Sequence, residues 1–297
     1  MTRAPATLTA TLAVLAAAIL WGSTGTLQSF LPPERAPLVV GAARLWIGAA
    51  ALIALAALQP AARAALRQLP KRALFTAAAA IAAYNMLFFA AVALAGVGLG
   101  TAVTIGSAPL WVAAYDVLWL RQRPSLRKAF GQALAIVGAG ALVLAGATGG
   151  SAPLGLALAA AAGLCYATYS LASSRMTAHA PPATIAASTF SLAALFTTPV
   201  FFLLPWGWAL TGTAPLTLVA LGLGATGLAY ALYTWGLKAL HASTAVTLAL
   251  AEPLTAWVLA LLVVGEAATP LKLTGAALLL AGLYIVTSDK DKHAEGL

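Results

Sequence analysis

Charged side chains are scarce in this sequence. They account for 8% of the 297 residues, and only seven of these residues are acidic. A soluble domain carries roughly 25% charged residues, which cover its water-facing surface. This chain has too few of them to form such a surface, so the composition excludes an ordinary soluble globular protein.

Residues that form disulfides and metal sites are equally rare. Cys165 is the single cysteine, which excludes an intrachain disulfide, and His179, His241 and His293 are scattered along the chain. The HExxH motif of zinc proteases and the phosphate-binding P-loop of ATPases are both absent from the sequence. We therefore expect no metal and no other cofactor, and we expect that the protein is not an enzyme.

Long apolar runs make up most of the sequence. Hydrophobic residues account for 62%, and the mean hydropathy is +0.95. A helix needs roughly 20 apolar residues to cross about 30 Å of hydrocarbon, and continuous Ala/Leu runs fit helices rather than the strands of a barrel. We predict an all-α integral membrane protein in the lipid bilayer, with ten transmembrane helices near residues 8–30, 37–58, 73–95, 99–120, 127–146, 153–174, 183–204, 215–237, 242–264 and 270–288.

Basic residues gather in alternate connections between the predicted spans. The N-terminus and the connections after spans 2, 4, 6, 8 and 10 hold most of the 16 basic residues, namely Arg3, Arg63, Arg67, Lys71, Arg72, Arg121, Arg123, Arg127, Lys128, Arg175, Lys238, Lys290 and Lys292. Lysine and arginine in short connections mark the cytoplasmic side. We expect both termini in the cytoplasm of a bacterium, with the protein in the inner membrane. The net charge of +9 then reflects orientation, and we expect no nucleic-acid partner.

The second half of the sequence repeats the first. Thr101–Leu110 reads TAVTIGSAPL and Thr244–Leu254 reads TAVTLALAEPL, with one extra residue in the second copy. Because each copy holds five spans, an odd number, the two copies must cross the membrane in opposite directions. We predict two inverted five-helix repeats, residues 1–147 and 148–297, a plan typical of alternating-access carriers.

Short motifs in two of the spans and in the connection after span 9 resemble one family of membrane proteins. Leu20-Trp21-Gly22 in span 1 is similar to an LWG signature, Glu252-Pro253 in span 9 to an EP element, and Gly265-Glu266 to the GE that precedes two glycines at the end of a repeat. Together they resemble the EamA family of the drug/metabolite transporter superfamily, over nearly the whole chain. The first half departs from this pattern, because Arg121-Gln122 stands where the second half has Gly265-Glu266.

The resemblance implies ten helices in two inverted repeats and the export of small metabolites. Among its branches we favour the amino-acid exporters, including the exporters of aromatic amino acids, and we expect a monomer. Carriers of nucleobases, sugars or drug-like solutes stay open as alternatives. A channel would need a ring of filter groups, and a rhomboid-type protease would need a histidine inside a span; the sequence offers neither, while a rigid membrane scaffold stays open.

Aromatic and polar side chains form stripes on four predicted spans. Aromatic faces attract ammonium groups, and hydroxyls and amides supply hydrogen bonds. We predict a central cavity lined by spans 1, 3, 6 and 8, with spans 4 and 9 contributing; packing between helices is the alternative role. The candidates are Trp21, Thr24, Gln28, Tyr84, Asn85, Phe88, Tyr166, Tyr169, Ser170, Tyr230, Tyr233 and Thr234.

Glu252 is the one acidic residue near the centre of a predicted span. A charge at this depth costs at least roughly 2.5 kcal/mol, so we include Glu252 among the cavity residues. It is predicted to bind a substrate amine, to carry a coupling proton or to make a structural hydrogen bond. Arg44, in span 2, is expected to reach the membrane surface or to meet Glu34.

Two prolines lie in the middle of the paired spans 4 and 9. Pro109 and Pro253 each remove one backbone hydrogen bond and are predicted to kink their helices. With Gly106 nearby, we predict that they act as hinges of alternating access. A static kink that shapes helix packing is the alternative.

Overall fold

The structure is a computed structural model of the chain that describes residues 3–144, 153–265 and 267–289. These residues form helices and contain no strand. Ten spans are long and apolar enough to cross a membrane, which confirms the predicted all-α membrane fold. The predicted boundary between residues 147 and 148, and Glu266 of the GE motif, lie outside the described residues.

The ten spans begin and end within a few residues of the predicted positions. Spans 1 to 5 are α1 (Arg3–Gly22) with α2 (Thr24–Gln28), α3 (Pro37–Ala57), α5 (Lys71–Ala95), α6 (Val97–Leu118) and α7 (Leu126–Leu144). Spans 6 to 10 are α8 (Pro153–Met176), α9 (Pro182–Thr197) with α10 (Val200–Leu203), α11 (Ala214–Ala220) with η3 (Leu221–Leu228) and α12 (Ala229–Gly236), α13 (Ala242–Leu248) with α14 (Ala251–Leu259) and η4 (Ala260–Val264), and α15 (Pro270–Ser288). Short helices α4 (Pro60–Ala64), η1 (Ala65–Gln68) and η2 (Gly207–Leu210) lie in connections.

Proline and glycine set the ends of several spans. Spans 2, 6, 7 and 10 begin at a proline, whose missing N–H falls where a helix has no partner for it. Gly96 separates α5 from α6 with a φ of 81°, a backbone conformation that glycine adopts at little cost. The chain therefore reverses between spans 3 and 4 with almost no loop.

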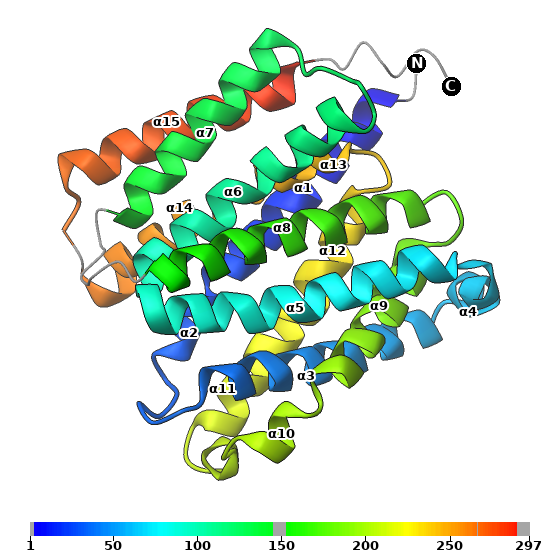
Figure 1. Cartoon of the computed structure of the whole chain (residues 1–297), viewed down its shortest axis with the longest axis vertical. Helices are drawn as coiled ribbons and strands as arrows, with labels where there is room; N and C mark the ends of the chain where they lie inside the picture. Colours follow the sequence, from blue (N-terminus) through cyan, green and yellow to red (C-terminus); the bar gives the residue numbers. More distant parts are fainter. Residues whose placement is uncertain (1–2, 145–152, 266, 290–297) are drawn as a thin grey trace.

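Spans of the two halves pack against each other in matched pairs. Span 3 (α5) of the first half packs on spans 6 (α8) and 7 (α9) of the second half. In the same way, span 8 (α12 and η3) of the second half packs on spans 1 (α1) and 2 (α3) of the first. Helix α6 packs on α8 as α14 packs on α1. Figure 1 shows α7 and α15, the last spans of the two halves, side by side at one edge. Two inverted repeats related by a two-fold axis in the membrane plane would give this pairing.

Glycines that match between the two sequence repeats hold α7 against α15. A Cβ added at Gly282 would lie 2.6 Å from the carbonyl oxygen of Gly131, and one added at Gly275 would lie 3.0 Å from that of Gly138. Small residues at such positions let membrane helices approach closely. Backbone proximity between spans 5 and 10 therefore accounts for these matched positions.

The basic connections lie together at one end of the bundle. Figure 1 places α4 and the connections α6–α7, α8–α9 and α12–α13 toward the right and upper right, where α1 begins and α15 ends. These connections carry Arg63, Arg67, Arg121, Arg123 and Lys238. We refer to this end of the molecule as the basic end.

Candidate functional site

Aromatic side chains from spans 1, 3, 6 and 8 meet in the interior of the bundle. The ring centroid of Trp21 lies 4.9 Å from that of Tyr230, 5.4 Å from that of Tyr233 and 6.1 Å from that of Tyr166. Tyr84 joins the cluster at 5.5 Å from Tyr166. Aromatic pairs attract each other at these separations. The stripes recognised in the sequence therefore form one cluster in space.

A small cavity of about 20 Å³ lies among these rings, and we refer to it as the aromatic pocket. Such a volume suffices for about one water molecule. Spans 4 and 9 contribute apolar and hydroxyl side chains to it, as predicted, although the sequence did not single out these residues. The lining consists of Trp21, Tyr84, Thr104, Ile105, Tyr166, Tyr230, Val246, Ala249 and Glu252.

A hydrogen-bonded layer lies behind the rings of the aromatic pocket. The hydroxyl of Ser170 donates to the carbonyl oxygen of Tyr166 at 2.9 Å, so the hydroxyl of Tyr233, 2.8 Å from Ser170, is the donor in the second bond. Tyr169 and Thr234 are hydrogen-bonded through their hydroxyls at 3.4 Å. Ser170, Tyr233, Tyr169 and Thr234 are not among the lining residues, so they support the rings and do not line the pocket.

The other predicted residues lie farther from the pocket. Phe88 stacks on Tyr84 at 5.9 Å, and buried Asn85 donates to the carbonyl oxygen of Ile81 at 3.0 Å. Thr24 and Gln28 lie on α2, beyond the interruption of span 1 at Ser23, and are not among the lining residues. The sequence predicted one continuous helix face from Trp21 to Gln28. In the structure only Trp21 of this face lines the pocket, because the helix is interrupted at Ser23.

Glu252 lines the aromatic pocket from the first turn of α14. Arg44 lies on α3, in span 2. The Arg44 side chain is only 8% exposed; its Nε donates to the hydroxyl of Thr226 at 2.9 Å and its Nη2 to the carbonyl oxygen of Ala225 at 3.0 Å. The expectation that Arg44 reaches the membrane surface is therefore wrong, because η3 supplies buried acceptors for it. The signal was present in the sequence as a lone basic residue inside a span.

Three hydrogen-bonding groups of the aromatic pocket are left without a partner within the described part of the chain. They are the Trp21 Nε1 and the hydroxyls of Thr104 and Tyr166, all of them buried. An unsatisfied buried polar group costs about 1–3 kcal/mol. All three atoms belong to residues that line the pocket, so a polar group inside the pocket would satisfy them.

The two predicted hinge prolines have different surroundings. Pro109 lies inside the continuous helix α6, where a Cβ added at Gly106 would contact Ile136 at 3.6 Å. Span 9 is instead interrupted between α13 and α14, just before Pro253. Proline has no N–H to offer the carbonyl of Ala249, which accepts from the backbone of Glu252 at 3.0 Å. A hinge role for these residues stays a prediction.

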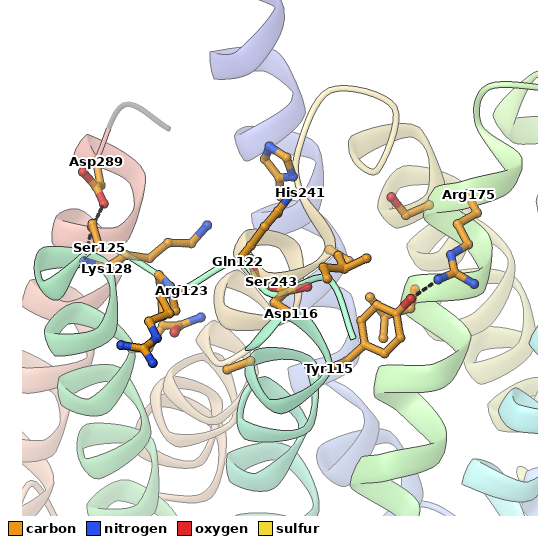
Figure 2. A pocket seen from close by; sticks show the side chains of 17 residues that line it. Tyr115, Asp116, Gln122, Arg123, Ser125, Lys128, Arg175, His241, Ser243 and Asp289 are labelled. Carbon is orange, nitrogen blue, oxygen red and sulfur yellow. Dashed lines mark hydrogen bonds between the residues drawn. The ribbon is translucent and has the colours of Figure 1, made fainter. Parts of the chain in front are cut away.

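A second and much larger cavity, of about 470 Å³, lies at the basic end. Its ionisable lining residues are Asp116, Arg123, Lys128, Arg175, His241 and Asp289. Figure 2 shows the Arg175 guanidinium bonded to the hydroxyl of Tyr115, and Ser125 bonded to Asp289. We refer to this cavity as the basic-end pocket. The sequence signal for it was present, but these charges were interpreted only as determinants of membrane orientation.

One hydrogen bond lies between the two cavities. Gln132, which lines the basic-end pocket, donates from its Nε2 to the hydroxyl of Thr247 at 3.1 Å. Thr247 follows Val246, which lines the aromatic pocket. The bond therefore joins α7 to α13 at the level where the larger cavity ends and the smaller one begins.

Comparison with known proteins assigns the chain to a family. The profile of the EamA-like transporter family matches residues 8–144 and again residues 153–288. The chain is 36% identical over 284 residues to the "Uncharacterized transporter YwfM" of Bacillus subtilis (strain 168), covering 95% of both proteins. It is also similar to a solved crystal structure with 23% sequence identity, a TM-score of 0.82, and coverage of 96% of this chain and 98% of the other, which supports the fold alone. The protein is a multi-pass membrane transporter and belongs to the EamA-like transporter family.

Proposed function

We propose that this protein is a secondary transporter that exports amino acids, aromatic ones included, across the bacterial inner membrane by alternating access. The observation that carries the proposal is the aromatic pocket itself. It combines four aromatic residues, one carboxylate and three hydrogen-bonding groups without a partner, between spans that pair across the two halves. Family membership supports the transport of a small solute but does not name it.

The lining of the aromatic pocket matches the parts of an aromatic amino acid. Glu252 and the faces of the surrounding rings attract an ammonium group. The Trp21 Nε1 and the Thr104 hydroxyl are donors for a carboxylate. Tyr84 and Tyr230 offer flat apolar surface to a ring. A zwitterion with an apolar side chain would thus use each of these groups.

The small volume of the aromatic pocket supports a mechanism with alternating conformations. Ligand pockets usually measure roughly 300–1,000 Å³, whereas this one measures about 20 Å³. The spans around it must therefore separate before a solute can bind. We propose that the halves, residues 1–147 and 148–297, move against each other; the two separate matches of the family profile support this division.

The charge distribution supports export. Basic connections mark the cytoplasmic side of a membrane protein, so we propose that the basic end and both termini face the cytoplasm. The basic-end pocket of about 470 Å³ then opens toward the cytoplasm, where a solute destined for export would enter. The aromatic pocket is enclosed by spans of one chain, so we propose that a monomer is sufficient for transport.

Counterflow in proteoliposomes tests this function. Vesicles loaded with unlabelled phenylalanine are expected to accumulate external labelled phenylalanine with saturation, and vesicles loaded with adenine or glucose are not. Glu252→Gln should raise the KM for phenylalanine at least about tenfold, the effect of losing a charge-assisted hydrogen bond. Glu34→Gln, at an exposed acid outside the pocket, is the matched control. Exchange of adenine or glucose without any amino acid would refute the substrate class.

A carrier of organic amines is the second candidate. It is favoured by the lining of the aromatic pocket, which contains one acidic side chain and no basic one. Phenethylamine, which is phenylalanine without its carboxylate, separates the two functions. If it exchanges faster than phenylalanine and does not require the Trp21 and Thr104 donors, the substrate is an amine rather than an amino acid.

A further inference from the structure

The basic-end pocket has the size and the chemistry of a ligand site. A volume of about 470 Å³ falls within the usual range of roughly 300–1,000 Å³ for ligand pockets. Its lining combines three permanently basic side chains, Arg123, Lys128 and Arg175, with two acidic ones, Asp116 and Asp289. The surplus of one positive charge suits a singly charged anionic group.

Two of the charged side chains are held by neighbouring residues. Arg175 donates to the hydroxyl of Tyr115 and its guanidinium carbon lies 5.4 Å from the centre of that ring. Asp289 accepts from Ser125, whose hydroxyl also accepts from the backbone N–H of Lys128 at 3.0 Å. Asp289 and the first turn of α7 are thereby fixed relative to each other. Hydrogen bonds between lining residues therefore hold Arg175 and Asp289 in place at the pocket wall.

Lys128 is buried near the end of a membrane span. Its side chain is 8% exposed, and that of Lys272, in the first turn of α15, is 7% exposed, whereas Arg127 and Arg123 are exposed. Figure 2 shows Lys128 extending from the first turn of α7 toward the middle of the pocket. Lys128 therefore lines a cavity of ligand size. This position, rather than burial alone, points to a fixed charge for a ligand.

The two pockets follow each other along the same helices. On α8, Tyr166 lines the aromatic pocket and Leu171 lines the basic-end pocket. On α13, Val246 lines the aromatic pocket and Ser243 lines the basic-end pocket. These spacings of five and three residues correspond to roughly 8 and 5 Å of helix. The bond between Gln132 and Thr247 lies at this boundary. The two pockets therefore lie at neighbouring levels of the same two helices.

We propose that the basic-end pocket is a second ligand site, where Lys128 and Arg123 bind the carboxylate of the solute before it enters the aromatic pocket. The identity of the solute as an amino acid rests on the proposed function; the carboxylate site itself does not. The two sites have opposite charge preferences, because the basic-end pocket carries a surplus of one positive charge and the aromatic pocket contains a single acidic residue. Together they select zwitterions over plain amines and plain acids.

Cysteine reporters test the site without any transport measurement. In a Cys165→Ala background, Ser174→Cys, or Ser243→Cys on the facing wall, places a thiol in the pocket lining. The rate of modification is compared for a sulfonate-bearing and a trimethylammonium-bearing methanethiosulfonate reagent. Lys128→Met should lower the anionic-to-cationic rate ratio about tenfold, since losing one charge a few ångströms away slows one reagent and speeds the other. Lys128→Arg should retain the ratio, and Arg67→Met, on exposed η1, should leave it unchanged.

Protection of the same cysteines identifies the bound group. Phenylalanine and 3-phenylpropionate, which both carry a carboxylate, should slow modification, and phenethylamine should not; Lys128→Met should abolish the protection. Protection by phenethylamine equal to that by 3-phenylpropionate would overturn the proposal. So would equal rate ratios in Lys128→Met and Arg67→Met. Because 3-phenylpropionate lacks the amine, its binding is informative even if no amino acid is transported.

Discussion

Gly22 lets α1 approach α14 closely beside the aromatic pocket, and replacing it with alanine tests the geometry of that pocket. A Cβ at this position would lie 2.6 Å from the Cβ of Thr255 and 2.7 Å from the carbonyl oxygen of Glu252. Gly163 stands in a comparable place on span 6, where a Cβ would lie 2.7 Å from the carbonyl oxygen of Thr104. Each half therefore uses a glycine to bring its first span onto the proline-containing span of the pocket.

The cost of Gly22→Ala follows from these distances. Ordinary carbon contacts begin near 3.5 Å, so α1 and α14 must separate by roughly 1 Å. Overpacking of this kind destabilises a protein by about 1–3 kcal/mol. Trp21 and Glu252 are carried apart by the same shift, so substrate affinity should fall as well as stability.

The matched control is Gly25→Ala, three residues farther along span 1, where an added Cβ meets nothing within 4 Å. Both variants gain the same methyl group and the same change in helix propensity. We expect Gly22→Ala to lower the melting temperature in detergent by several degrees and to raise the KM in counterflow, with Gly25→Ala close to wild type. Identical melting temperatures and KM values for the two variants would refute the argument that helix proximity at Gly22 shapes the site.

Three further substitutions test other contacts. Gln132→Leu removes the hydrogen bond to Thr247, which is worth about 1 kcal/mol. If this bond hinders movement of the solute between the two pockets, counterflow should become about fivefold faster; an unchanged rate would show that it does not. Arg44→Met leaves the acceptors of η3 without their donor. The loss of a charged hydrogen bond costs roughly 1.5–3 kcal/mol of stability, so this variant should have a clearly lower melting temperature than Arg63→Met, which changes an exposed position. Gly138→Ala would press on the backbone of Leu279 and should destabilise the pairing of spans 5 and 10, whereas Gly140→Ala, with nothing within 4 Å of its Cβ, should not; equal stability of the two would contradict the close packing.

The fold was predictable because the bilayer leaves few choices. Lipid offers no hydrogen bonds to a backbone, so each apolar run of sufficient length must be a helix. Prolines and glycines then fixed the ends, as at Pro37 and Gly96. The interruptions inside spans 1, 7 and 9 and the π-helical segment η3 of span 8 were not predictable. In η3, for example, Ala225 and Thr226 accept hydrogen bonds from Arg44 of another span, a tertiary contact that the local sequence does not indicate.

The candidate site was predictable only in part, for a physical reason. Aromatic stripes on repeat-related spans indicated Trp21, Tyr84, Tyr166 and Tyr230, which do line one pocket. Polar residues in the same stripes make hydrogen bonds within the protein, as Ser170 does, and are therefore not available to a ligand. Periodicity identifies a helix face but not the partner of each hydroxyl. The large basic-end pocket combines residues from four spans and the segments that flank them, and its basic residues, taken helix by helix, indicated only membrane orientation.

The prolines of spans 4 and 9 match in sequence, but the helices around them do not match in structure. Eight residues separate Thr101 from Pro109, and nine separate Thr244 from Pro253. Helix α6 runs unbroken through its proline, whereas span 9 takes up its extra residue in the interruption before Glu252. Two halves with unequal backbones at this point will not bend equally. We therefore expect the bending of alternating access to concentrate in span 9. There Glu252, the acid proposed to bind the solute, lies next to the interruption of the helix, so that binding at Glu252 would act directly on the segment that bends.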